Sequence, residues 1–215
     1  MVQSFPVPPL SVVLPGFLVL VLSLSFHEAA HAFTADRLGD PTARMLGRLT
    51  LNPLAHVDWI GTVLFPLVGM LSGLPLIGWA KPVPVNPVNL KAPRRDFAVV
   101  AAAGPISNLI LATVAASVRA VLRSLTPDVS GAVGALEDVL LAAVVINVLL
   151  AVFNMIPVPP LDGGNVAMGV LPAPLARVFA QLRPWGFLIL YGLLLTGVLW
   201  EITQPINNAI LRWLL

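Results

Sequence analysis

The feature that most constrains this chain is the apolar run from Leu10 to Ala35, because three ionisable side chains lie inside it. A helix rises about 1.5 Å per residue, so a run of this length can cross the roughly 30 Å hydrocarbon layer of a membrane. His27, Glu28 and His31 fall in its second half. An acidic group at the bilayer centre costs on the order of 2.5 to 3.5 kcal/mol on insertion scales, so these side chains are expected to face protein or a water-filled cavity.

Composition places the rest of the chain in the membrane as well. Hydrophobic residues make up 58% of the sequence and charged residues 10%, whereas soluble domains carry roughly 25% charged residues. The 215 residues include no polar segment long enough for a separate soluble domain. The sequence therefore predicts a single membrane-embedded domain over residues 1–215, and a net charge of only +2 gives no sign of a nucleic-acid partner.

Apolar segments predict an all-α polytopic membrane protein with about four full spans. A further apolar segment, residues 60–80, is interrupted by glycines and prolines, which predicts a re-entrant or broken hairpin. Two other segments are expected to lie at the membrane interface. The predicted spans are residues 10–35, 97–122, 136–156 and 185–200, and the predicted interfacial segments are 174–183 and 202–215.

The segment "KPVPVNPVNL", residues 81–90, alternates prolines with valines in a way that a helix does not tolerate. Prolines at alternate positions suit a short β edge segment that cannot donate hydrogen bonds on one side. An unwound substrate could then pair along the other side, which makes Val83 and Val85 candidate substrate-binding residues. A plain interfacial loop is the alternative.

The sequence "HEAAH", residues 27–31, has the arrangement of a metal-dependent hydrolase. His27 and His31 lie four residues apart, so they share one face of a helix and can ligate one ion. Glu28 can reach a water on the open coordination position and take its proton as general base. Because the chain has no cysteine, nitrogen and oxygen ligands must complete the site.

A third metal ligand has to come from elsewhere in the chain, and the best candidate lies in "NMIPVPPLDGGN", residues 154–165. Three prolines end the preceding helix, and two glycines allow a tight turn that could aim Asp162 inward. An ordinary turn aspartate at the membrane surface is equally compatible with this pattern.

Together these motifs resemble the site-2 protease family of intramembrane zinc metalloproteases. The resemblance rests on residues 27–31, on the Asn154, Pro157, Leu161, Asp162, Gly163 pattern and on "AGPISN" at residues 103–108. It implies one Zn²⁺ on His27, His31 and Asp162, with Glu28 as general base. It also implies cleavage of membrane-anchored proteins within their transmembrane segments. The sequence resembles a minimal member without a PDZ or CBS domain.

Membrane topology limits whether Asp162 can lie near His27 and His31. Both His27 and Asp162 lie towards the exits of their helices, so the spans 10–35 and 136–156 must run parallel if the two residues are to meet. Residues 97–122 supply the one crossing between them, and 60–80 must then return to its own side. Basic residues gather on the metal side, which the positive-inside rule makes cytoplasmic. The expected location is the plasma membrane of a prokaryote, with the active site towards the cytoplasm.

Three more polar residues have two possible roles each. Asn154 is a candidate catalytic residue that could donate to a substrate carbonyl or a developing oxyanion, or it could cap carbonyls at the end of its helix. Asn108 is a candidate substrate-binding residue, although interhelical hydrogen bonding also explains it. His56 could support the site from outside or lie at the interface, and the interfacial reading is favoured.

Two other functions remain open. A metal transporter would need polar ligands along a path through the bilayer, and the sequence offers one cluster. A non-cleaving scaffold of the same fold is the second, but Glu28 is retained beside both histidines.

Overall fold

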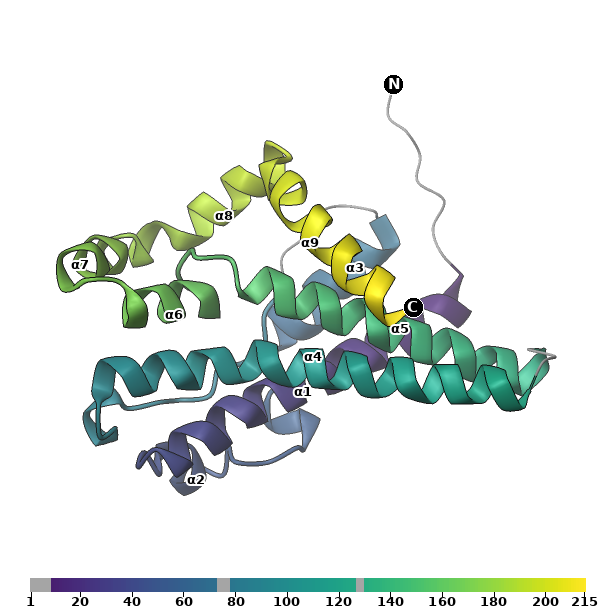
Figure 1. Cartoon of the computed structure of the whole chain (residues 1–215), viewed down its shortest axis with the longest axis horizontal. Helices are drawn as coiled ribbons and strands as arrows, with labels where there is room; N and C mark the ends of the chain where they lie inside the picture. Colours follow the sequence, from purple (N-terminus) through teal and green to yellow (C-terminus); the bar gives the residue numbers. More distant parts are fainter. Residues whose placement is uncertain (1–8, 73–77, 127–129) are drawn as a thin grey trace.

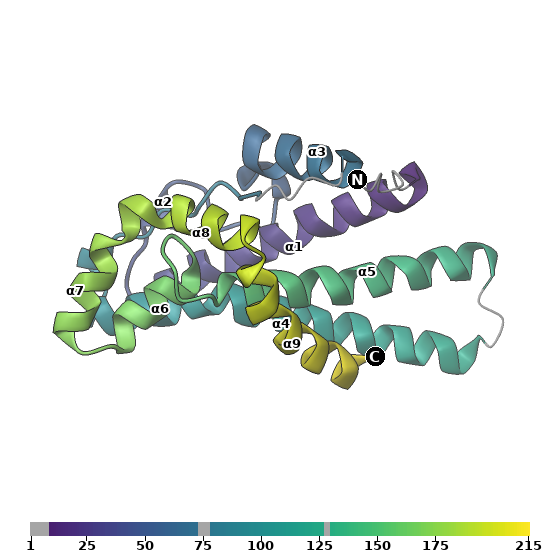
Figure 2. The same ribbon diagram turned by 90° about the horizontal axis from the view of Figure 1, so that it is seen from above.

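Three long helices form the centre of the protein in the computed structural model, which describes residues 9–72, 78–126 and 130–215. The first and third run in the same direction and the second runs opposite to them (Figures 1 and 2). This is the parallel arrangement that topology predicted. The three helices are α1 (Leu10–Arg37), α4 (Pro93–Leu125) and α5 (Gly131–Asn154).

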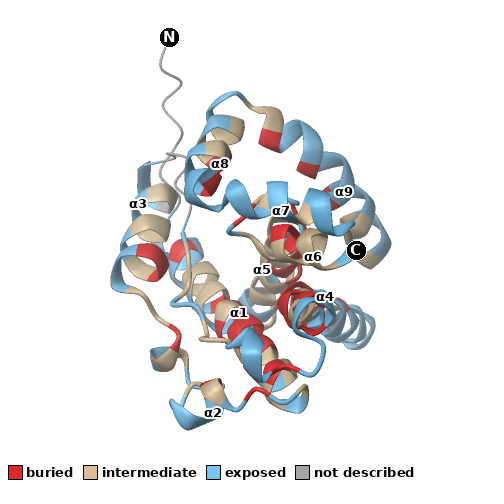
Figure 3. Ribbon diagram, turned by 90° about the vertical axis from the view of Figure 1, so that its left-hand side faces the viewer, coloured by how far each residue is buried: buried red, intermediate tan, exposed pale blue. Residues whose placement is uncertain are grey.

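Small side chains on α4 explain why these helices approach closely. Ala98, Ala101, Gly104, Asn108 and Ala112 recur every three or four residues and are all buried. Small residues on one face let helix backbones approach closely in a membrane, where dispersion contacts rather than water exclusion drive association. Figure 3 shows buried positions concentrated where the central helices meet, while the outward faces are exposed, as lipid-facing surfaces are.

The segment predicted as a hairpin does return on itself. Its first arm contains a π-helix, Trp59–Leu64, and α3, Phe65–Ser72. Trp79 N–H donates to the carbonyl of Gly61 at 3.0 Å, and Lys81 N–H donates to that of His56 at 2.9 Å. The two arms therefore lie side by side, and the apolar helix Trp59–Gly69 is too short to span a bilayer. Residues 73–77 of the predicted 60–80 segment lie outside the described residues.

The predicted β edge segment at residues 81–90 is wrong. No strand occurs in the described part of the chain, and these residues form an irregular stretch that ends in a 3-10 turn, Pro87–Asn89. The prolines remove three amide donors from the segment. Two of the remaining amides, on Val83 and Asn86, bond to carboxylates instead of to a neighbouring strand.

The C-terminal part consists of short helices, and here the predicted boundaries shift. The helix expected at residues 185–200 ends at Leu195, because Gly197 adopts a left-handed φ of 79° and turns the chain into the next helix. The fourth apolar stretch long enough to cross a membrane is Ala173–Leu195, which includes the predicted interfacial segment 174–183. The elements are α6 (Asp162–Val170), α7 (Ala173–Gln181), a 3-10 turn (Arg183–Trp185), α8 (Gly186–Leu195) and α9 (Val198–Leu214).

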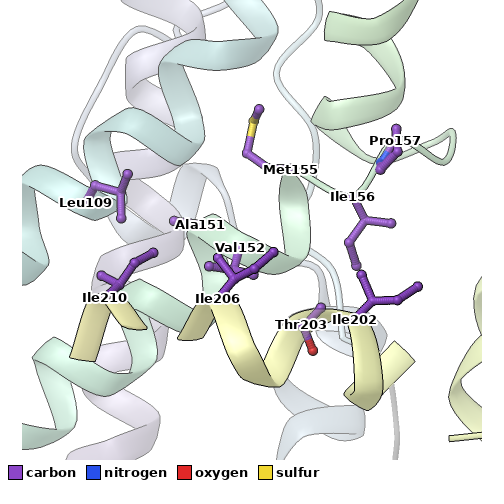
Figure 4. Close-up of a pocket in the computed structure, with 10 residues that line it drawn as sticks. All are labelled: Leu109, Ala151, Val152, Met155, Ile156, Pro157, Ile202, Thr203, Ile206 and Ile210. Carbon is purple, nitrogen blue, oxygen red and sulfur yellow. The ribbon is translucent and has the colours of Figure 1, made fainter. Parts of the chain in front are cut away.

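Helix α9, predicted as interfacial over 202–215, packs across the central helices. Leu211 and Leu214 contact the buried residues Ala115, Ala116 and Val144 of α4 and α5. Between the same helices lies an apolar cavity of about 260 Å³ (Figure 4). Its lining among the described residues is apolar apart from Thr203.

The hairpin geometry predicts that Gly61→Ala destabilises the protein. A Cβ at residue 61 would lie 2.4 Å from the Trp79 indole, so the two arms would have to separate. Overpacking of this kind costs about 1 to 3 kcal/mol. The thermal midpoint of the purified protein in detergent should fall for Gly61→Ala. It should not fall for Gly16→Ala, where nothing lies within 4 Å of the added Cβ. Equal midpoints for the two variants would contradict the described hairpin.

Candidate metal centre

Helix α1 brings its three ionisable side chains together below the surface. His27, Glu28 and His31 are 4%, 8% and 9% exposed. The two imidazole rings lie 4.7 Å apart, and one ligand atom from each of the three residues lies within 4.8 Å of the others. This is the helical i, i+4 geometry that the sequence predicted.

Asp162 joins these residues from the other end of the chain. Its Oδ2 lies 3.0 Å from His27 Nε2 and 3.5 Å from His31 Nε2. The same oxygen is buried without a hydrogen-bond partner among the described residues. Burial raises the pKa of Asp162, but the neighbouring His27 and His31 lower it to about 2, so the carboxylate is ionised at neutral pH. The structure thus places the predicted third ligand against both histidines.

The opposite ring nitrogens show which atoms are free to bind a metal. His27 Nδ1 lies 2.6 Å from Asn108 Oδ1, and His31 Nδ1 lies 2.7 Å from the carbonyl oxygen of Val100. Both partners are acceptors, so each Nδ1 carries a hydrogen, and each Nε2 faces Asp162. Two ring nitrogens and a carboxylate that converge in this way fit a divalent cation.

A buried amide network fixes the orientation of Asn108. Its nitrogen donates to Asn147 Oδ1 at 2.8 Å, so its oxygen must face His27. Asn147 in turn donates to Ser23 Oγ at 2.9 Å. Asn108 is fully buried behind His27, which supports a histidine-holding position rather than the predicted contact with substrate. Sequence reasoning missed Asn147 and Ser23, although a mid-span asparagine in an apolar helix was a usable signal.

The close approach of α4 depends on Gly104. A Cβ at this position would lie 2.5 Å from His27 Nε2 and from His31 Nε2. Any side chain here would therefore occupy the space between the two nitrogens. The glycine of the "AGPISN" segment thus leaves room for an ion and its ligands.

The helix that carries Asp162 is held at both ends. The Arg94 guanidinium on α4 donates to the carbonyls of Met168, at 2.7 Å, and Leu171 at the C-terminal end of α6. At the other end, a Cβ on Gly163 would lie 2.2 Å from the carbonyl oxygen of Met155. Only glycine permits this contact, which places the neighbouring carboxylate.

The remaining predicted residues lie around this centre. The Val83 N–H donates to Glu28 Oε2 at 2.8 Å, and Val85 is half-buried two residues further on. Asn154 donates to the carbonyl of its own helix at Leu150, at 2.9 Å, which matches the helix-end reading. His56 is buried and bonded to the carbonyl oxygen of Thr50 at 2.8 Å, and its place at the membrane interface stays a prediction.

Comparison with known proteins agrees with this geometry. The family model for peptidase family M50 matches residues 125–196. A Bacillus subtilis protein named "Putative zinc metalloprotease YwhC" is 34% identical over 95% of this chain and 92% of its own length. The chain belongs to peptidase family M50.

Other relatives extend the match. The Rip2 protein of Mycolicibacterium smegmatis, which carries the same descriptive name, is 34% identical over 89% of this chain and 71% of its own length. Rip2 of Mycobacterium tuberculosis is 32% identical over 87% and 68%. No solved structure matches the chain significantly. M50 is the site-2 protease family that the motifs resemble, and zinc is the metal of that family.

The position of Gly104 predicts that Gly104→Ala lowers zinc binding. The added Cβ would lie 2.5 Å from both Nε2 atoms, so an ion could not bind both without displacing α4. Zinc per chain, measured by atomic emission after identical purification, should fall to a small fraction of the wild-type value. Gly192→Ala, where nothing lies within 4 Å of the added atom, should keep the wild-type content. Full zinc content in Gly104→Ala would show that the ion binds elsewhere.

Proposed function

We propose that this protein is an intramembrane zinc endopeptidase that cleaves the transmembrane segments of membrane-anchored proteins. The proposal rests on one observation: Asp162 of α6 lies against His27 and His31 of α1. Glu28 lies on the same helix as the two histidines. Three convergent ligands and an adjacent carboxylate are the parts of a zinc hydrolase.

In the proposed site, His27, His31 and Asp162 would hold one zinc ion. When bound, zinc would supply Lewis acidity towards water and the scissile carbonyl. Glu28 would take the proton of the attacking water and pass it to the leaving amine. The Val83 N–H would hold one Glu28 oxygen at 2.8 Å and leave the other for that proton.

Substrate contact is assigned by position. Asn154 lies at the C-terminal end of α5, eight positions before Asp162, and would turn its amide to a substrate carbonyl only by releasing Leu150. Val83 and Val85 stay candidates because their segment covers Glu28. Asn108 would act through His27 and not on substrate.

The proposed orientation places the site towards the cytoplasm of a bacterial plasma membrane. His27 lies about 26 Å along α1 from Leu10 at 1.5 Å per residue, close to the exit of the helix. Helices α1 and α5 run parallel (Figure 1), so Asp162, which follows α5, would lie on the same side of the membrane. The bias of basic residues then makes this side cytoplasmic. These residues are Arg37, Arg44, Arg48, Lys81, Lys91, Arg94, Arg95, Arg177 and Arg183.

The decisive test is Glu28→Gln in vesicles that contain a tagged single-span substrate. Loss of the proton acceptor should slow cleavage by about 10²- to 10⁴-fold, while both histidines keep zinc bound. Glu201→Gln removes an exposed glutamate on α9 and should cleave at the wild-type rate. The readouts are product on a gel and zinc per chain.

Two results would contradict the proposal. Normal cleavage by Glu28→Gln would remove Glu28 from the chemistry. Absence of cleavage by the zinc-loaded wild type against a panel of single-span substrates would favour a scaffold, and zinc flux into the same vesicles would favour a transporter.

A further inference from the structure

Residues 81–90, here called the covering segment, reach Glu28 through Val83 and have no regular strand structure. The contact with Glu28 is made by one backbone group, the Val83 N–H, at 2.8 Å from Oε2. An irregular segment needs other bonds to hold such a group in place, because each free residue loses about 1 to 2 kcal/mol of conformational entropy when it is ordered.

Val83 is flanked by two prolines, Pro82 and Pro84, which have no backbone N–H. Val83 therefore carries the only amide donor among these three residues. Proline also forces the residue before it into an extended conformation, so Val83 cannot fold into a turn. The segment is therefore stiff. If it moved along by one residue, a proline, which has no N–H to donate, would lie against Glu28 in place of Val83.

Asp40 anchors the far end of the covering segment. It is fully buried, and its carboxylate accepts from the Asn86 N–H at 2.6 Å and from Asn89 Nδ2 at 2.8 Å. Thr42 donates to the same carboxylate through its backbone N–H and its hydroxyl. Burial raises the pKa of Asp40, but these hydrogen bonds outweigh it and lower the pKa below its usual range, so the anchor is charged at neutral pH.

Asp40 and Glu28 are fixed to the same helix. The Asp40 N–H donates to the carbonyl of Ala35 in the last turn of α1, at 2.9 Å. Gly39 makes this turn with a φ of +110°, and a Cβ there would lie 3.1 Å from the carbonyl oxygen of Asn89. Helix α1 thus sets both the base and the anchor of the segment that touches the base. At the near end, Arg48 donates to the carbonyl of Lys81 at 2.8 Å.

We propose that Asp40 is a positioning residue for Glu28, which acts by holding the covering segment so that the Val83 N–H orients the Glu28 carboxylate. The inference rests on the proposed function, since it assigns Asp40 a part in the same reaction. Asp40 itself lies outside the reacting atoms. It determines where the covering segment lies, and the covering segment determines where one Glu28 oxygen points.

The first arm of the test measures the segment without any catalysis. The native chain has no cysteine, so single cysteines can be placed at residue 85, half-buried, and at residue 88, which is 85% exposed. Asp40→Asn replaces one accepting oxygen with an NH₂ group, which cannot accept a hydrogen bond, and should release the segment. Maleimide labelling of Val85→Cys should then accelerate at least tenfold, while Val88→Cys should label at an unchanged rate. Unchanged labelling at residue 85 would overturn the proposal.

The second arm measures cleavage of the single-span substrate by variants without introduced cysteines. Asp40→Asn should lower kcat by about 10- to 100-fold, as expected for loss of one hydrogen bond to a charged group, with KM within twofold and zinc content unchanged. Asp138→Asn, the same change at an exposed site at the start of α5, should leave kcat unchanged. A wild-type kcat in Asp40→Asn would overturn the proposal.

Rescue separates positioning from general damage. The double variant Asp40→Asn with Asn89→Asp exchanges donor and acceptor and should restore part of both kcat and the protection of residue 85. If Asp40→Asn alone does not fold, Asn89→Ala removes one anchor bond and should change both readouts in the same direction by a smaller factor. Loss of zinc with loss of activity, not reversed by the exchange, would show a purely structural role. Inactivity of the wild type would count against the proposed function, and the labelling result would stand apart from it.

Discussion

Ionisable side chains at membrane depth must be partnered, and this requirement organises the protein. An unpaired charge there costs several kcal/mol, so each polar atom of the α1 cluster needs a partner from another element. His27 bonds to Asn108 and His31 to the carbonyl of Val100, both on α4, while Glu28 accepts from Val83. The remaining nitrogens face Asp162 of α6. The elements that satisfy the cluster are those that define the fold, so building the site and folding the chain are one problem.

Close approach is the geometric condition for this arrangement. Gly104 lets α4 lie against the two histidines, and Gly163 lets α6 lie against the end of α5. A larger residue at either position would clash with its neighbours and push the proposed ligands apart. Other residues support this arrangement from further out. Asn147 accepts from Asn108, which bonds to His27, and Arg94 holds the helix of Asp162. Asp40 holds the covering segment. In the proposed site, the positions of the ligands are thus set by groups that would not touch the ion.

The sequence was enough to predict the features that follow from helical periodicity and from the number of membrane crossings between two spans. Helical spacing paired His27 with His31, and counting crossings placed Asp162 near them. The β edge at residues 81–90 failed because side-chain carboxylates, which no local pattern reveals, take the amides of Val83 and Asn86. The end of α8 was missed because a single left-handed residue, Gly197, sets it.

The central claim is that Asp162 completes a metal site with the histidines of α1. Zinc per chain in wild type and Asp162→Ala, purified identically in detergent, tests it most directly, with Asp138→Ala as the control for loss of a carboxylate. We expect about one zinc per wild-type and control chain, as a three-ligand site binds one ion, and a strong loss in Asp162→Ala. Unchanged zinc in Asp162→Ala would remove this residue from the ligands and contradict the account.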